Sequence, residues 1–127
     1  MLAIQGLMGC TALWHAAAAY FFIARTEGML AVHTHERPVS PVAQDMMRFL
    51  GGINTGYAVL AVCGIRQTGV ALAVISGTLA IANLSQFWFD VVAHRSGRWK
   101  KRLRFITAGD GMFAVLQGVT TAWLLTP

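Results

Sequence analysis

The stretch that decides the fold class is the run at residues 2–24, which reads LAIQGLMGCTALWHAAAAYFFIA. Its only ionisable side chain is that of His15. An α-helix needs about 20 predominantly apolar residues to cross the hydrocarbon core of a bilayer. This run is long enough and apolar enough to do so, and it predicts a membrane-spanning helix.

Three further apolar runs follow at residues 46–65, 69–89 and 105–125. None alternates polar and apolar residues as a half-buried strand does. Inside a bilayer, a helix satisfies its backbone hydrogen bonds within its own segment. The sequence therefore predicts an all-α fold, an integral membrane four-helix bundle that forms one domain over residues 1–127. Ser40 and Pro41 are typical of an N-cap and a first helical position, so the second helix is expected to begin outside the lipid.

The composition excludes an ordinary soluble domain. Of the 127 residues, 56% are hydrophobic and only 12% are charged, whereas soluble domains carry about 25% charged residues. The mean hydropathy is +0.57. Most charged residues fall in two connections, one between the first and second runs and one between the third and fourth. Little of the predicted chain is therefore left outside the membrane.

Basic residues are distributed unevenly between the two sides of the predicted bundle. Only Arg66 lies on the side that holds the short turn at residues 66–68. The other side carries Arg25, Arg37, Arg48, Arg95, Arg98, Lys100, Lys101, Arg102 and Arg104. Because Lys and Arg in short loops resist translocation, we expect both long connections in the cytoplasm and both termini on the non-cytoplasmic side.

The basic cluster at residues 95–104 contains Trp99 and lies directly between two predicted spans. Each Lys or Arg near an anionic membrane surface contributes about 1 kcal/mol of attraction. Membrane lipids are therefore expected partners. A nucleic-acid partner is not expected, because the cluster is flush with two membrane ends and has no fold of its own.

The candidate functional residues are the polar ones inside the predicted spans, because each is costly in lipid and should face the bundle interior. On the third run, the spacing of Ser76, Asn83, Gln86 and Asp90 places them on one helical face. The predicted ligand-binding residues are His15, Arg48, Asn54, Asn83, Gln86, Asp90, Asp110 and Gln117.

Most of these residues fall in the cytoplasmic half of the spans, and they predict a polar pocket that opens toward the cytoplasm. Arg48 is expected to form an ion pair with Asp110 or Asp90. One interpretation is that the polar groups only hydrogen-bond the helices together. A second is that the pocket binds a lipid, a quinone or another amphipathic ligand. A third gives His15 or Asp110 a role in proton transfer.

The remaining histidines and the cysteines carry weaker signals, and no cofactor is assigned from them. A haem with two histidine ligands is not expected, since His15 has no second imidazole at its depth. His33, His35, Glu36 and His94 share the cytoplasmic side and suit a metal site, but without a specific spacing a solvated loop is favoured. Cys10 and Cys63 fall at similar depths, yet buried free thiols are favoured over a disulfide.

Small and aromatic residues indicate how the helices pack. Gly52 and Gly56 are spaced for close approach of another helix, either within the chain or outside it. On the second run, the predicted inward stripe contains Arg48, Gly52 and Thr55, with Asn54 turned away from it. The aromatic residues expected to face lipid or a neighbouring subunit are Trp14, Tyr20, Phe87, Trp88, Phe89 and Trp123.

The segment RFLGGIN at residues 48–54, which opens the second of four spans in a short chain, resembles the DoxX-like group of small bacterial membrane proteins. The resemblance covers the layout of four spans and this glycine-rich motif. It implies a multi-pass protein of the bacterial inner membrane with possible redox partners, and it assigns no functional residue.

The functional prediction is a small accessory subunit of a larger membrane complex, with other membrane proteins as partners. It is based on the small extramembrane mass and on the lack of a self-sufficient catalytic set in the sequence. The first alternative is a stand-alone membrane protein that binds a lipid or quinone in the polar pocket. The second is a small membrane enzyme that uses His15 and Asp110.

Overall fold

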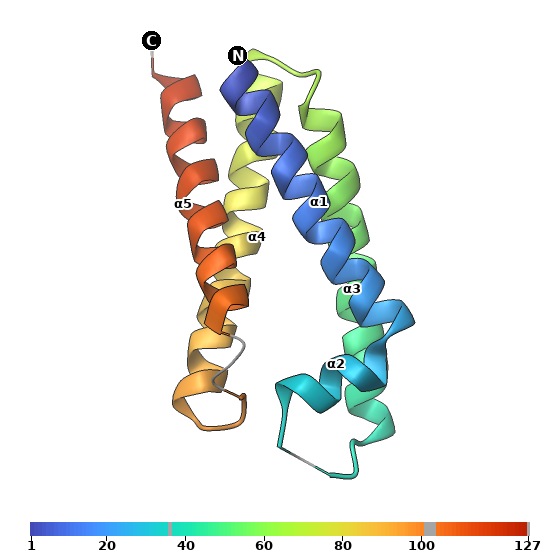
Figure 1. Cartoon of the computed structure of the whole chain (residues 1–127). Helices are drawn as coiled ribbons and strands as arrows, with labels where there is room; N and C mark the ends of the chain where they lie inside the picture. The colour runs from blue at the N-terminus through green and yellow to red at the C-terminus, as the bar shows by residue number, and fades with distance from the viewer. Residues whose placement is uncertain (36, 101–103, 127) are drawn as a thin grey trace.

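The computed structural model describes residues 1–35, 37–100 and 104–126. In these ranges the regular structure is helical, apart from one isolated bridge between Thr34 and Trp99. The helices are α1 (Leu2–Ala24), α2 (Thr26–His33), α3 (Pro41–Gly64), α4 (Gly69–Arg95) and α5 (Arg104–Leu125). Both termini and the α3–α4 turn lie at one end of the molecule (Figure 1). The two long connections lie at the other end, which we call the loop end.

The prediction of an all-α fold is confirmed, and the four apolar runs correspond to α1, α3, α4 and α5. Helix α3 begins at Pro41, and the Ser40 hydroxyl caps it by accepting a hydrogen bond from the Ala43 backbone N–H at 3.1 Å. Helix α4 continues past the apolar run to Arg95. The length of an apolar run predicts the part of a helix that can cross lipid, but the helix itself continues beyond that run.

Helices α1, α3 and α4 are long and apolar enough to cross a membrane. Helix α5 has 22 residues and carries Asp110 and Gln117, and it is not among these candidate spans. Three candidate spans are thus found by length and composition within the described ranges. The fourth span stays a prediction.

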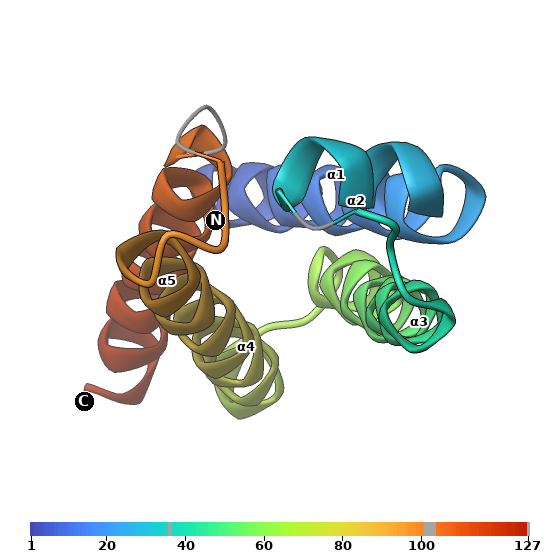
Figure 2. The same ribbon diagram turned by 90° about the horizontal axis from the view of Figure 1, so that it is seen from below.

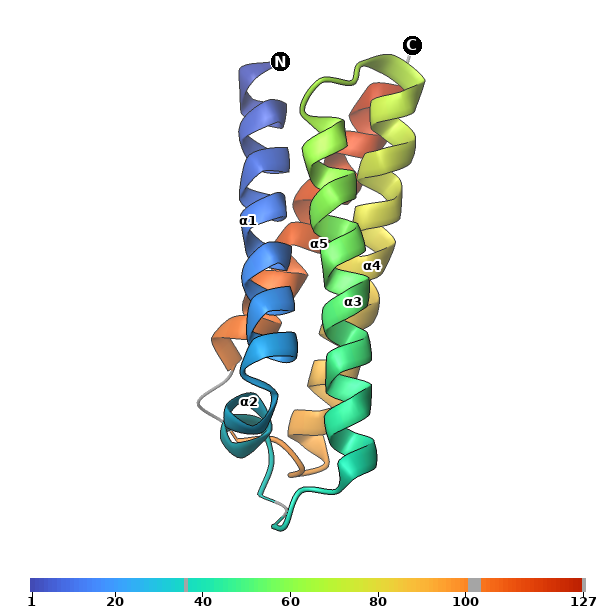
Figure 3. The ribbon, with the colours of Figure 1, turned by 90° about the vertical axis from the view of Figure 1, so that its right-hand side faces the viewer.

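Helix α2 was not expected from the sequence. It lies across the loop end, roughly perpendicular to the long helices (Figures 1 and 3). Its buried residues are Thr26, Leu30 and His33, which recur at helical spacing. Because α2 has only 8 residues, its sequence covers about two helical turns, and this is too short for a periodic pattern to distinguish a helix from a loop.

The long helices form two closely packed pairs, α1 with α3 and α4 with α5, and the pairs touch each other less extensively. Figure 2, viewed from below, shows α1 and α3 side by side and α4 and α5 side by side. The pairs meet around an apolar cluster made by Met8, Ala12, Ala61, Leu72 and Leu79. The turn between α3 and α4 thus joins the two pairs.

Gly51, rather than Gly52 or Gly56, allows α3 to approach α1. A Cβ atom at Gly51 would lie 2.5 Å from Cγ1 of Ile23, whereas Cβ atoms at Gly52 and Gly56 would meet nothing within 4 Å. Of the two alternatives for Gly52 and Gly56, a helix of this chain does not meet them among the described residues, and a helix outside the chain stays a prediction. The inward stripe is also turned from the predicted one, because Gly51 and Asn54 are buried while Gly52 and Thr55 are exposed.

The outer surface of the long helices is apolar. Tyr20, Trp88, Phe89 and Trp123 are exposed, as predicted. Two aromatic predictions are wrong. Trp14 is half-buried and turns toward α5, where Gly109 leaves room for its ring, and Phe87 is half-buried against Gly111. Both rings fill space beside a glycine on the neighbouring helix.

We expect Gly51→Ala to destabilise the α1–α3 pair, because the added methyl group displaces Ile23. Overpacking of this kind costs about 1–3 kcal/mol. The matched control is Gly52→Ala, which gains the same helix propensity and meets nothing within 4 Å. The measurement is thermal unfolding in a mild detergent. Equal midpoints for the two variants would contradict the predicted close approach.

Candidate functional site

His15 and Asn54 form a buried hydrogen bond between α1 and α3. The Asn54 amide N–H donates to the Leu50 carbonyl at 3.0 Å, which directs its Oδ1 toward His15. The His15 Nδ1–H donates to that oxygen at 2.7 Å, and the Tyr57 ring lies edge-on to the imidazole. The neutral imidazole therefore presents Nε2 as an acceptor, which is buried and has no hydrogen-bond partner among the described residues.

Gln117 links three helices through one side chain. The Ser76 hydroxyl of α4 donates to Gln117 Oε1 at 2.7 Å and lies 2.9 Å from the Gln117 carbonyl. The amide N–H of Gln117 donates to Thr11 Oγ1 of α1 at 2.8 Å. All three side chains are fully buried. This cluster satisfies its polar groups internally, as an apolar environment requires.

Asp110 and Asp90 are both buried, and each accepts a hydrogen bond from a neighbouring helix. Trp14 Nε1–H of α1 donates to Asp110 Oδ1 at 2.8 Å. The Thr107 hydroxyl of α5 donates to Asp90 Oδ2 of α4 at 3.2 Å. The two carboxyl groups are therefore anchored by neutral donors.

Arg48 does not join these carboxyl groups. Its side chain is 52% exposed and pairs with Asp45, one turn earlier on α3, at 3.2 Å. The expected ion pair with Asp110 or Asp90 is wrong, because α3 is rotated so that Met47 and Gly51 face inward while Arg48 faces outward.

Asn83 is fully buried on α4. Its amide N–H donates to the Leu79 carbonyl at 2.8 Å, and its Oδ1 is buried with no hydrogen-bond partner in the described part of the chain. Gln86, one turn further on, is half-buried. Leu79 and Ala12 belong to the apolar cluster, so Asn83 and His15 both lie about one turn beyond it toward the loop end.

Of the predicted site residues, the structure buries His15, Asn54, Asn83, Asp90, Asp110 and Gln117. It leaves Gln86 half-buried and Arg48 exposed. The sequence analysis missed Trp14 and Thr107 as partners of the two carboxyl groups. Helical periodicity identifies the inward face of one helix, whereas these two contacts depend on the register between helices.

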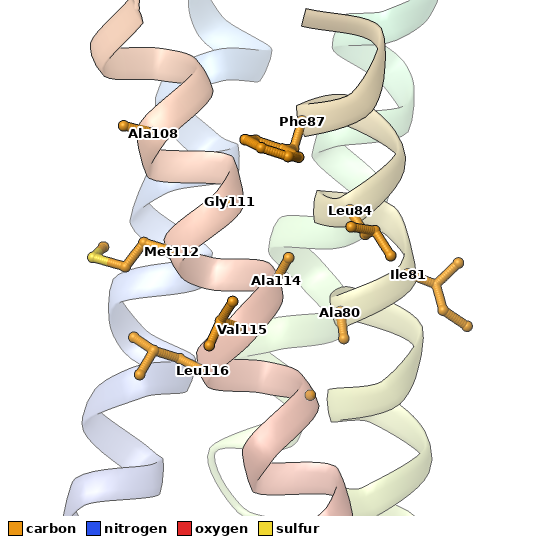
Figure 4. Close-up of a pocket in the computed structure, with 11 residues that line it drawn as sticks. Ala80, Ile81, Leu84, Phe87, Ala108, Gly111, Met112, Ala114, Val115 and Leu116 are labelled. Atoms are coloured by element: carbon orange, nitrogen blue, oxygen red, sulfur yellow. The ribbon is translucent and has the colours of Figure 1, made fainter. Parts of the chain in front are cut away.

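An apolar crevice lies outside this polar interior. It has a volume of about 790 Å³ and runs along the outer side of the α4–α5 pair (Figure 4). It is lined by Ala80, Ile81, Leu84, Phe87, Ala108, Gly111, Met112, Ala114, Val115, Leu116 and Gly118. Such a surface can accommodate hydrocarbon but offers no chemistry. The predicted polar pocket that opens toward the loop end stays a prediction.

A second cluster of ring side chains lies at the loop end. His33 of α2 is buried, its Nδ1–H donates to the Met29 carbonyl at 2.7 Å, and its ring centre lies 4.8 Å from that of Trp99. The His94 ring of α4 lies 5.7 Å from Trp99. A solvated loop is therefore the wrong description of His33. Burial lowers the pKa of His33, the bond to Met29 raises it, and the nearby His94 lowers it further.

The metal and disulfide alternatives gain no support in the described ranges. No group of three or more His, Cys, Asp or Glu side chains is placed to hold a metal ion among residues 1–35, 37–100 and 104–126. His35 is exposed, and Glu36 lies outside the described residues. Cys10 and Cys63 are free, as predicted, but both are exposed on the outer surface rather than buried.

No protein-family model, curated protein or solved structure matches this chain. The resemblance to the DoxX-like group therefore stays a prediction.

We expect Gln117→Leu to lower the stability of the folded protein by about 1–2 kcal/mol, because it removes two hydrogen bonds between buried side chains. The control is Thr120→Val on the same helix, whose exposed hydroxyl bonds only to the preceding turn. Unfolding by a denaturing detergent measures both. If the two variants unfold alike, Gln117 does not link the helices as described.

Proposed function

We propose that this chain is an integral membrane protein with four spans, α1, α3, α4 and α5. For α5, the support is that Asp110 and Gln117 turn inward, so its lipid-facing side presents Met112, Val115 and Val119. A helix whose polar side chains are hydrogen-bonded inside the protein can remain in lipid. The exposed apolar side chains on all four long helices agree with this assignment.

The proposed topology places the loop end in the cytoplasm and both termini across the membrane. Arg25, Arg95, Arg98 and Arg104 are exposed at the loop end, whereas Arg66 is the only basic residue of the α3–α4 turn. The positive-inside rule favours this orientation. Following the resemblance to the DoxX-like group, the proposed location is a bacterial inner membrane.

This topology predicts the behaviour of a reporter fused to the C-terminus in bacteria. Alkaline phosphatase, which folds only after export, should be active, and a fluorescent protein that requires the cytoplasm should be dark. Fusions placed in the loop after His35 should show the reverse pattern. A bright C-terminal fluorescent fusion would contradict the proposed orientation.

Within the membrane, the proposed role is that of an accessory subunit in a larger complex. The observation that carries this proposal is the crevice between α4 and α5, whose lining includes Ala80, Ala108 and Gly118. Membrane helices associate where small residues let another segment approach closely. A helix of a partner subunit is the occupant that suits an apolar crevice with these small residues.

The test is purification in a mild detergent followed by mass spectrometry of the intact assembly. We expect stoichiometric partner chains with the parent protein and their loss with Gly118→Leu, which fills the crevice. A Cβ atom at Gly118 meets nothing within 4 Å, so this variant should fold. Gly52→Leu, equally open but on α3, should retain the partners. A free parent monomer would count against the accessory role.

The second candidate function is the binding of a lipid or quinone head group in the polar interior. The observation in its favour is that His15 Nε2 and Asn83 Oδ1 are buried acceptors without described donors. An unsatisfied buried polar group costs about 1–3 kcal/mol, which a hydroxyl-bearing head group would recover. Organic extraction of the purified protein should yield a stoichiometric ligand, and Asn83→Leu should lose it. Extracts that match empty detergent micelles would exclude this candidate.

A further inference from the structure

The loop ends of the two helix pairs are joined by contacts between residues 31–34 and residues 94–100, which we call the loop latch. Thr34 and Trp99 form an antiparallel bridge. The Lys100 backbone N–H donates to the His33 carbonyl at 2.9 Å, and the Lys100 ammonium donates to the Ala31 carbonyl at 2.7 Å. Since α2 belongs to the α1–α3 side, the latch ties that pair to the α4–α5 pair.

Three rings occupy the centre of the loop latch. The rings of His33 and His94 both pack against the Trp99 indole. Their planes are nearly perpendicular to it, with interplanar angles of 81° for His33 and 86° for His94. Phe22 of α1 covers the other side of His33 at 6.4 Å. The His33 side chain is 2% exposed, and both ring nitrogens of His94 are buried without hydrogen-bond partners among the described residues. A positive charge added to the His33 ring would therefore be largely shielded from solvent.

The charged groups around His33 also oppose a positive charge there. His94 faces it from α4, and Lys100 approaches it from the α4–α5 connection. Arg37 lies beyond α2, where its guanidinium donates to the Ala31 carbonyl. The acidic residue of α2, Glu27, is exposed in the first turn, at the far end of the helix from His33. Glu36 lies outside the described residues. Among the described residues, the charged groups nearest to His33 are thus basic.

We propose that the loop latch is an acid-sensitive device: protonation of His33, within the His33–Trp99–His94 cluster, releases residues 31–34 from residues 94–100 and lets the two helix pairs separate at the loop end. The closed latch favours neutral His33, whereas the open latch exposes the imidazole to water. A free histidine has a pKa of about 6.5. As the pH falls through this value, the open latch takes up the proton more readily, and the equilibrium shifts toward opening.

Opening also changes what the loop end presents. Asp90 and its donor Thr107 lie near this end of the α4–α5 pair. Contacts between the two pairs are fewer than those within each pair, and they include the hydrogen bond from Trp14 to Asp110. Release of the loop latch therefore admits water toward Asp90, while the apolar cluster around Leu72 and Leu79 holds the opposite half together. This inference does not depend on the accessory-subunit role.

Distance measurement between two spin labels tests the loop latch. Labels are attached through Glu27→Cys and Arg95→Cys, both exposed positions, in a background of Cys10→Ser and Cys63→Ser. In lipid nanodiscs, the parent should show one short distance at about pH 7.5 and a longer or broader distribution at about pH 5. The change should be reversible. A distribution that is the same at both pH values overturns the proposal.

Histidine variants locate the sensor. His33→Gln should remain closed at the acidic pH, because the amide carries no titratable charge, whereas the control His35→Gln, at an exposed position, should respond as the parent does. If His33→Gln is already open at neutral pH, His94→Gln decides the question, since removing this neighbour should reduce the amplitude of the acid response. The proposal is overturned if His94→Gln opens at acidic pH to the same extent as the parent. It is also overturned if His33→Gln is closed at neutral pH and still opens at acidic pH.

Discussion

The structure depends on one constraint, which is that polar side chains on predominantly apolar helices must find hydrogen-bond partners on neighbouring helices. Gln117 illustrates it, since it binds both Ser76 and Thr11 and so fixes α5 against two other helices. Each such bond between membrane helices contributes only about 0.6 kcal/mol on average. Its geometric consequence is larger, because an unpaired buried group is costly and few rotations of a helix satisfy every group at once.

Glycines determine how closely the helix backbones approach one another, and this adds to the constraint from hydrogen bonding. The backbone at Gly51 abuts Ile23, and the backbone at Gly109 makes room for Trp14. The second contact brings the indole N–H within 2.8 Å of Asp110. Close packing and hydrogen bonding are therefore coupled, because the buried carboxyl receives its donor only where a glycine admits the large ring that carries it.

The helices were predictable from the sequence because apolar length and cap residues are local signals. The runs that become α1 and α5 gave bounds within one residue of the structure, and Ser40 marked the start of α3. The inward faces of α4 and α5 were also predictable, since Asn83, Asp90, Asp110 and Gln117 recur at helical spacing and are buried. These predictions needed only the geometry of one helix at a time.

What the sequence did not reveal depends on pairs of helices. The inward face of α3 was set wrongly because polarity favoured Arg48, whereas close contact with α1 requires Gly51 to face inward and leaves Arg48 in solvent beside Asp45. Trp14 was assigned to lipid or a neighbouring subunit, whereas its ring packs on Gly109 and its indole N–H reaches Asp110. The burial of His33 in α2 depends on contacts such as those of Thr34 with Trp99 and of His33 with Lys100, which are far apart in the sequence and which periodicity does not report.

The pairing of α1 with α3 and of α4 with α5 has a consequence for biogenesis. Each pair consists of long helices that emerge consecutively from the ribosome, so under the proposed four-span topology each would enter the bilayer as a hairpin. Within the first hairpin, His15 already meets Asn54; within the second, Ser76 meets Gln117 and Thr107 meets Asp90. The costliest polar groups are thus largely matched inside a single insertion unit, and docking of the two units adds the bonds from Trp14 and to Thr11 last.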